Sequence, residues 1–97
     1  MSSGTGSAEI DFGAHPGANE ASVTVSSQTD ILATSKVEAY VMADDTTTDH
    51  TASDHRYFAA FAGLSCGTPV ESDGFPIHAR STEKLTGKFA VRWVWVD

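Results

Sequence analysis

The stretch that decides the fold is Lys88-Phe-Ala-Val-Arg-Trp-Val-Trp-Val-Asp97. Its large apolar residues recur with a period of two and fall on one side: Phe89, Val91, Trp93 and Trp95. Aromatic and β-branched residues in this alternation are typical of a β-strand with one buried face. We therefore predict a strand over these residues, with the two tryptophans filling the core.

The opposite side of the same strand is also largely apolar, with Val94 and Val96 beside Ala90. A strand that is apolar on both faces is typical of a sheet that is covered on both sides. We therefore expect a second layer against the tryptophan face and another copy of the chain against the other face.

Five further segments have the pattern of strands. Alternation or a short apolar run bounded by turn residues marks residues 8–12, 21–26, 35–43, 56–66 and 75–80. Within the fourth, Phe58-Ala-Ala-Phe61 could instead form one helical turn. Six strands in this length predict an all-β fold, a small antiparallel two-layer β-sandwich without a helix of useful length. Residues 81–87 are predicted to form a loop.

The first seven residues differ in composition from the rest. After Met1 they contain only Ser, Gly and Thr, which is typical of a flexible segment. We predict a flexible N-terminal arm over residues 1–7 that docks onto a larger assembly, and a single β-sandwich domain over residues 8–97.

The 97 residues carry a net charge of −7, from 13 acidic and 6 basic side chains. A surface of this charge repels phosphate, which disfavours nucleic acids and anionic membranes as partners. The start of the chain has neither the basic nor the apolar region of a signal peptide, so we expect it to be made in a cytoplasm. Cys66 is the single cysteine and cannot form an internal disulfide; we predict a small buried side chain.

The densest polar cluster is Asp44-Asp-Thr-Thr-Thr-Asp-His-Thr-Ala-Ser-Asp-His55. We interpret it as a solvated connection that folding can do without, because Asp and Thr favour local turns. The alternative is a metal site shared between subunits, with imidazole and carboxylate ligands from Asp49, His50, Asp54 and His55. The five-residue spacing of the histidines matches no common helical ligand pair.

No nucleophile–base pair, phosphate-binding loop or cofactor motif stands out, so the sequence predicts a protein that is not an enzyme and needs no cofactor.

Several stretches resemble a group of small proteins encoded in tailed-bacteriophage and prophage genomes. They are Ile10-Asp-Phe-Gly13, Ala21-Ser-Val-Thr-Val25, Val37-Glu-Ala-Tyr40, Thr48-Asp-His-Thr-Ala-Ser-Asp-His55, Gly74-Phe75 and Val91-Arg-Trp-Val-Trp95. The Thr-Asp-His segment and the Trp-Val-Trp ending are the most specific. The resemblance implies a virion component assembled in the host cytoplasm, and it identifies no catalytic residue.

Together these observations predict a non-enzymatic virion structural protein, either a capsid decoration protein or a fibre-associated subunit. We expect it to form a homo-oligomer, a trimer, and to bind major capsid or tail proteins. The alternative is a tail-tip module that binds a carbohydrate or receptor, such as a host-surface glycan, through its tryptophans, Tyr40 and Asp, Asn and His residues of its loops.

Overall fold

The computed structural model describes residues 2–42 and 44–97, which form two three-stranded antiparallel sheets and one short helix. The predicted all-β fold is therefore confirmed. In chain order the elements are β1 (Ser3–Asp11), β2 (Ala18–Val25), β3 (Lys36–Tyr40), α1 (Ala52–Phe61), β4 (Ala62–Cys66), β5 (Phe75–Leu85) and β6 (Lys88–Val96).

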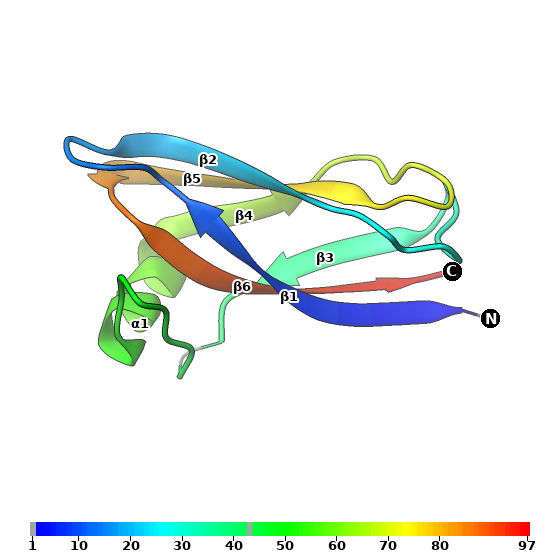
Figure 1. The fold of residues 1–97 in the computed structure, drawn as a ribbon, viewed down its shortest axis with the longest axis horizontal. Coiled ribbons are helices and arrows are strands. Elements are labelled where there is room, and N and C mark those ends of the chain that lie inside the picture. Colours follow the sequence, from blue (N-terminus) through cyan, green and yellow to red (C-terminus); the bar gives the residue numbers. More distant parts are fainter. Residues whose placement is uncertain (1, 43) are drawn as a thin grey trace.

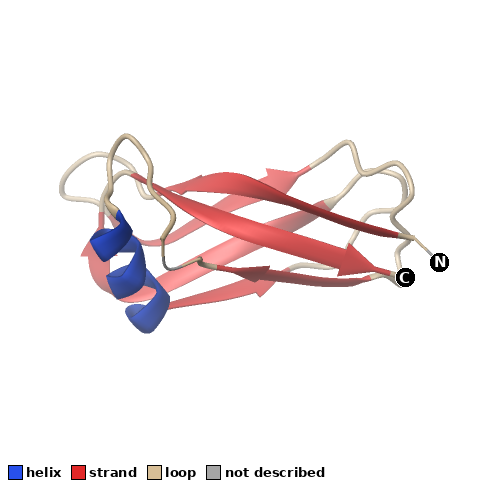
Figure 2. Cartoon of the chain, turned by 90° about the horizontal axis from the view of Figure 1, so that it is seen from below, coloured by secondary structure: helices blue, strands red, loops and turns tan. Residues whose placement is uncertain are grey.

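The strands are ordered β1-β6-β3 in one sheet and β2-β5-β4 in the other, and Figure 1 shows the two sheets as separate layers. The central strands β5 and β6 are joined by a short turn and lie in opposite sheets, whereas the consecutive strands β4 and β5 pair within one sheet. The edge strands β1 and β2 approach each other along one side of the sandwich, and β3 and β4 along the other. Figure 2 shows α1 at the opposite end of the sandwich from both termini.

The core lies between the two sheets and takes its largest side chains from the inward faces of β5 and β6. Alternation along β6 places four residues inward, all at most 6% exposed: Phe89, Val91, Trp93 and Trp95. β5 contributes Phe75, Ile77 and Ala79 in the same way. Burial of such side chains stabilises the fold by about 1.5–3 kcal/mol each.

The first strand corrects the prediction of a flexible arm over residues 1–7. Ser3–Ser7 form the first half of β1 and pair with the last residues of β6. Gly4 and Gly6 lie directly opposite Trp95 and Trp93, and a Cβ atom on Gly6 would lie 2.5 Å from Trp93 Cζ2. The glycines therefore leave room for the indole rings against the β1 backbone. Met1 lies outside the described residues.

The helix α1 corrects the prediction of one strand over residues 56–66. Residues 52–61 are helical, and only Ala62–Cys66 continue as a strand. The side chains of His55 and Phe58, three residues apart on one helix face, are buried at one end of the core. Phe58 stacks on Phe89 with ring centroids 4.4 Å apart.

A further correction concerns residues 81–85. They were predicted to form a loop, but they extend β5 to Leu85.

Candidate functional site

The Asp- and His-rich segment lies against a part of β6 that has no second strand partner among the described residues. β1 pairs with β6 along its whole length, whereas β3 pairs with it only from Arg92 to Val96. On the β3 side, the beginning of β6 would therefore present unpaired backbone groups, which are costly when they are buried and invite pairing when they are exposed.

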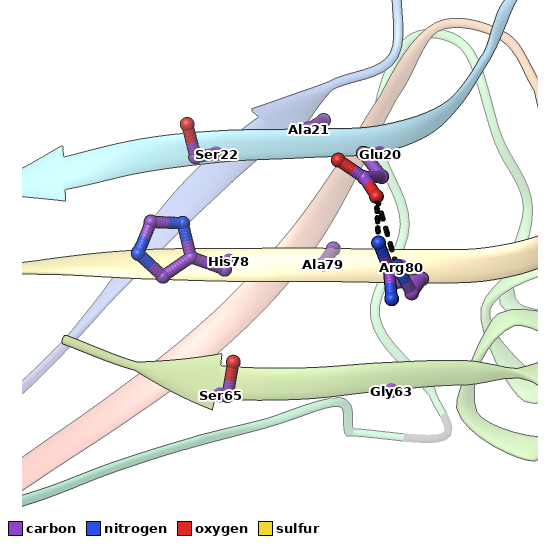
Figure 3. Close-up of a pocket in the computed structure, with 8 residues that line it drawn as sticks. All are labelled: Glu20, Ala21, Ser22, Gly63, Ser65, His78, Ala79 and Arg80. Atoms are coloured by element: carbon purple, nitrogen blue, oxygen red, sulfur yellow. Dashed lines mark hydrogen bonds and ion pairs between the residues drawn. The ribbon is translucent and has the colours of Figure 1, made fainter.

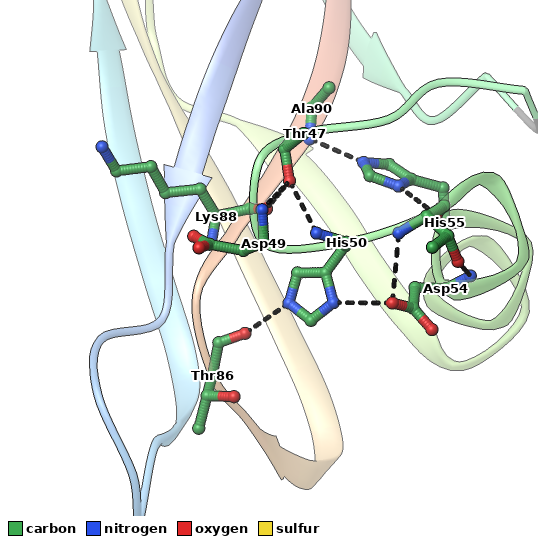
Figure 4. A network of polar contacts seen from close by, with 9 residues as sticks. Thr47, Asp49, His50, Asp54, His55, Thr86, Lys88 and Ala90 are labelled. Carbon is green, nitrogen blue, oxygen red and sulfur yellow. Dashed lines mark hydrogen bonds and ion pairs between the residues drawn. The ribbon is translucent and has the colours of Figure 1, made fainter.

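Side chains of residues 47–55 supply the missing hydrogen bonds, as Figure 4 shows. The backbone N–H of Lys88 donates to Asp49 Oδ2 at 2.9 Å, and its carbonyl accepts from Thr47 Oγ1 at 2.7 Å. The N–H of Ala90 donates to His55 Nε2 at 2.9 Å. We call residues 47–55 the β6 cover, because their side chains take the place of a strand.

His55 is fully buried, and both of its ring nitrogens are used. Because Nε2 accepts a hydrogen bond from an N–H group, the proton of the neutral ring sits on Nδ1, which donates to the carbonyl of Thr51 at 2.9 Å. His55 therefore joins the first turn of α1 to β6 and has a structural role.

His50 lies between two acceptors. Its Nδ1 is 3.0 Å from Asp54 Oδ2, and its Nε2 is 2.6 Å from the carbonyl oxygen of Thr86. A neutral ring can donate to only one of these, whereas the imidazolium donates to both. The ring also stacks on Phe89 with centroids 3.9 Å apart. His50 thus ties the β6 cover to the turn between β5 and β6.

Asp54 connects His50 to the start of α1. The Thr51 side chain accepts from the N–H of Asp54, and Asp54 Oδ2 accepts from the N–H of Thr51, which together form a capping box. Hydrogen bonds from His50 and from the Thr51 backbone hold the pKa of Asp54 below its ordinary value. The carboxylate therefore stabilises the helix start in its charged form.

A second ion pair lies where the β3 pairing ends on β6. Arg92 donates from its Nη2 to Asp45 Oδ1 at 2.8 Å and from its Nε to Oδ2 at 3.3 Å. These hydrogen bonds from the guanidinium, opposed by partial burial, lower the pKa of Asp45. Only 12% of the Asp45 side chain is exposed, so the pair is better shielded from water than an ordinary surface ion pair.

These contacts correct the interpretation of residues 44–55 as a solvated connection that folding can do without. All four ring nitrogens of His50 and His55 are within hydrogen-bond distance of a protein partner. A metal shared between subunits at Asp49, His50, Asp54 and His55 would have to break some of these bonds. Within residues 2–42 and 44–97, no group of three His, Cys, Asp or Glu side chains is placed to hold a metal ion.

A second polar feature lies on the outer face of the β2-β5-β4 sheet. A shallow depression of about 370 Å³ lies there, and Figure 3 shows the residues that line it. His78 stands between its cross-strand neighbours Ser22 and Ser65, and the next row holds an ion pair between Glu20 and Arg80. All five side chains are exposed, and they offer both donors and acceptors to a polar ligand.

The other residues singled out from the sequence occupy different environments. Trp93 and Trp95 are buried, and Trp95 Nε1 donates to Gln28 Oε1 at 3.0 Å. On the outer face of β6, Val94 is half-buried and Val96 is 41% exposed. Cys66 is half-buried in β4, and burial, reinforced by the charge of Glu38, raises the pKa of its thiol. The thiol form therefore predominates at neutral pH.

Comparison of the chain with protein-family models, with curated proteins and with solved structures finds no match in any of the three. The helix of the described residues is too short and too polar to cross a membrane. The fold and the β6 cover define a small antiparallel β-sandwich whose Asp- and His-rich segment completes a sheet edge.

Proposed function

We propose that this chain is a non-enzymatic structural subunit of a bacteriophage virion, either a capsid decoration protein or a fibre-associated subunit. The observation that carries the proposal is an apolar seam between the edge strands β3 and β4. A groove of about 260 Å³ there is lined by the side chains of Ala39, Tyr40, Val41, Ala59, Ala62 and Leu64.

Large apolar side chains reach solvent from the same part of the chain. Tyr40 is 39% exposed and Met42 is 41% exposed. Apolar side chains gathered at an open edge of a small domain favour contact with another protein, because that contact removes them from water. This supports a protein that works by binding copies of itself and the surface of an assembly.

The use of the polar residues supports the same proposal. The Asp, Thr and His side chains of the β6 cover, which were the best candidates for chemistry, bond to backbone groups of β6 and of α1. Their arrangement accounts for a rigid sheet edge, as a subunit that works by contact requires. The resemblance to phage-encoded proteins supports the proposal that this contact is made in a virion, which is assembled in the host cytoplasm.

The proposal is tested on particles of the phage or induced prophage that encodes the chain. Purified particles should contain the protein in many copies, measurable by peptide mass spectrometry, and imaging should place it at symmetry-related positions on the capsid or tail. An abundant cytoplasmic host protein serves as the control for contamination. Particles that contain no more of the chain than of this control would contradict the proposal.

The polar depression on the β2-β5-β4 sheet favours a second candidate, a tail-tip module that binds a carbohydrate or receptor. The buried tryptophans cannot stack on a sugar, so such a site would use His78 and Arg80 instead. Saturable binding to one class of glycan, lost in His78→Ala and retained in His15→Ala, would favour this function. His15 is the matched control because it is exposed on the turn between β1 and β2 and does not line the depression.

A further inference from the structure

β3 is a five-residue edge strand whose outer side carries no strand in the described part of the chain. Its side chains alternate: Lys36 and Glu38 are exposed, and Val37 between them is half-buried. A strand with one unpaired edge presents backbone donors and acceptors that can pair with another strand. The occupant of this edge can be inferred from its charges.

We propose that β3 pairs with β3 of a second copy of this chain, antiparallel, about a two-fold axis that passes through Val37. In this register Lys36 lies directly across from the partner subunit's Glu38, and the two-fold axis repeats the pair. The edge is therefore complementary to itself in charge. Opposite charges directly across from each other stabilise a strand pair, and like charges destabilise it.

The two neighbouring registers of the same parity are disfavoured by the same rule. An axis through Lys36 would place the two Lys36 ammonium groups opposite each other. An axis through Glu38 would place the two Glu38 carboxylates opposite each other and would leave Lys36 across from an uncharged Tyr40. Charged side chains on an edge strand often deter pairing, but in the register about Val37 the opposite charges of Lys36 and Glu38 attract each other. Residues of opposite sign two positions apart on one face instead specify a single register.

Packing on both faces of β3 agrees with this arrangement. On the inner face, Val37 is the cross-strand neighbour of Trp95, so two opposed Val37 side chains would continue the core from one copy to the next. A depression of about 130 Å³ lies over the paired strands β3 and β6 and is lined by Lys36, Val37, Glu38, Val94, Trp95 and Val96. The outer-face valines, half-buried or exposed in one copy, border the paired strands.

The contact is isologous, so it closes as a dimer and replaces the trimer expected from the sequence. In this register only residues 36–38 of each β3 face each other, so the interface is smaller than the roughly 1,200 Å² of stable complexes and the dimer should depend on protein concentration. This inference rests on the proposed contact function and names the surface through which copies meet.

The test is sedimentation of the purified chain over a range of protein concentration, together with three variants: Lys36→Glu, Glu38→Lys and the double charge reversal. Each single change turns both cross-strand pairs into like-charge pairs and should raise the dimer dissociation constant about tenfold or more. The double variant restores opposite charges and should return it to within about twofold of the parent. Lys84→Glu and Glu71→Lys carry the same charge changes at exposed positions outside β3 and should leave it unchanged.

Unfolding curves verify that each variant is folded before its mass is compared. A chain that stays monomeric at all concentrations, an oligomer indifferent to both single changes, or a double variant as weak as the singles would overturn the β3 contact. A monomer that is nevertheless present in virions would leave the proposed function standing. A charge-dependent dimer that is absent from virions would support the β3 contact and contradict the proposed function.

Discussion

At the scale of single residues, His55 has the most demanding environment in the chain. It is fully buried, accepts from Ala90 N–H and donates to the Thr51 carbonyl. We expect His55→Ala to lower the free energy of unfolding by about 2–4 kcal/mol, because it leaves a cavity and removes the partner of the Ala90 N–H, while the Thr51 carbonyl keeps its bond from the N–H of residue 55. Chemical denaturation measures this. His78→Ala, on the exposed face of β5, should change it by less than about 0.5 kcal/mol; equal effects of the two changes would contradict the role of His55.

The glycines of β1 give a second prediction at this scale. Gly6→Ala would place a Cβ atom 2.5 Å from the Trp93 ring, so we expect a loss of about 1–3 kcal/mol from overpacking. Gly63→Ala on β4 is the matched control, since its Cβ would meet no atom within 4 Å. That change should be neutral or slightly stabilising, because alanine restricts the unfolded chain more than glycine does. Thermal unfolding of both variants checks the contrast; a Gly6→Ala protein as stable as Gly63→Ala would refute it.

At the scale of elements, period-two alternation located the strands with large side chains but not those without them. β2, β5 and β6 were predictable because apolar residues occupy every second position. The first half of β1 was not, since Ser, Gly and Thr are typical of disorder when read alone. The signal lay in a comparison: Gly4-Thr-Gly6 has the same period as Trp93-Val-Trp95, so small residues can face large ones across an antiparallel pair.

The helix α1 was missed for a related reason. An apolar run with Phe and Ala fits a buried strand or a helix equally well. The deciding signal was Thr51-Ala-Ser-Asp54, which has the form of a capping box and marks a helix start. The β6 cover could not be predicted from the sequence, because its partners are backbone groups 35 to 41 residues further along the chain.

Two acidic residues in and next to the β6 cover, Asp54 and Asp45, make the free energy of unfolding of the chain depend on pH. The pKa values of Asp45 and Asp54 are lowered from 3.8 in the folded chain, so the unfolded chain takes up protons first as the pH falls. Their contribution is therefore complete above about pH 5 and is lost progressively at lower pH. We expect Asp45→Asn to reduce the loss of stability between about pH 5 and pH 2.

Denaturant unfolding at a series of pH values measures this dependence. Asp30→Asn removes the same charge at an exposed position outside residues 44–55. It should leave the slope of stability against pH close to that of the parent. A slope that is the same in all three proteins would show that the Arg92–Asp45 pair does not persist in solution.

At the scale of the whole molecule, the two sides of the sandwich are closed by different means. On one side β1 and β2 approach each other, and both chain ends are joined there: Ser2 N–H donates to Asp97 Oδ2 at 2.7 Å, and Asp97 N–H donates to the Ser2 carbonyl. On the other side β3 and β4 are short and leave the apolar seam between them. The difference explains why contact with other subunits is expected at β3 rather than at β1.

The N-terminal residues therefore belong to the domain, and their removal should unfold it. Deleting residues 2–7 would take away five of the nine register pairs between β1 and β6, at positions 3 to 7, and would expose the Trp93 and Trp95 rings that lie over Gly4 and Gly6. Loss of that much pairing and burial is comparable with the whole stability of a small domain, about 5–15 kcal/mol. We expect an unfolded or aggregated protein, measured by circular dichroism and by solubility. The variant Ser3→Thr/Ser7→Thr keeps the glycines and changes only exposed positions, so it should fold with unchanged or slightly higher stability. A truncated chain that unfolds cooperatively at the temperature of the parent would show that residues 3–7 are an arm after all.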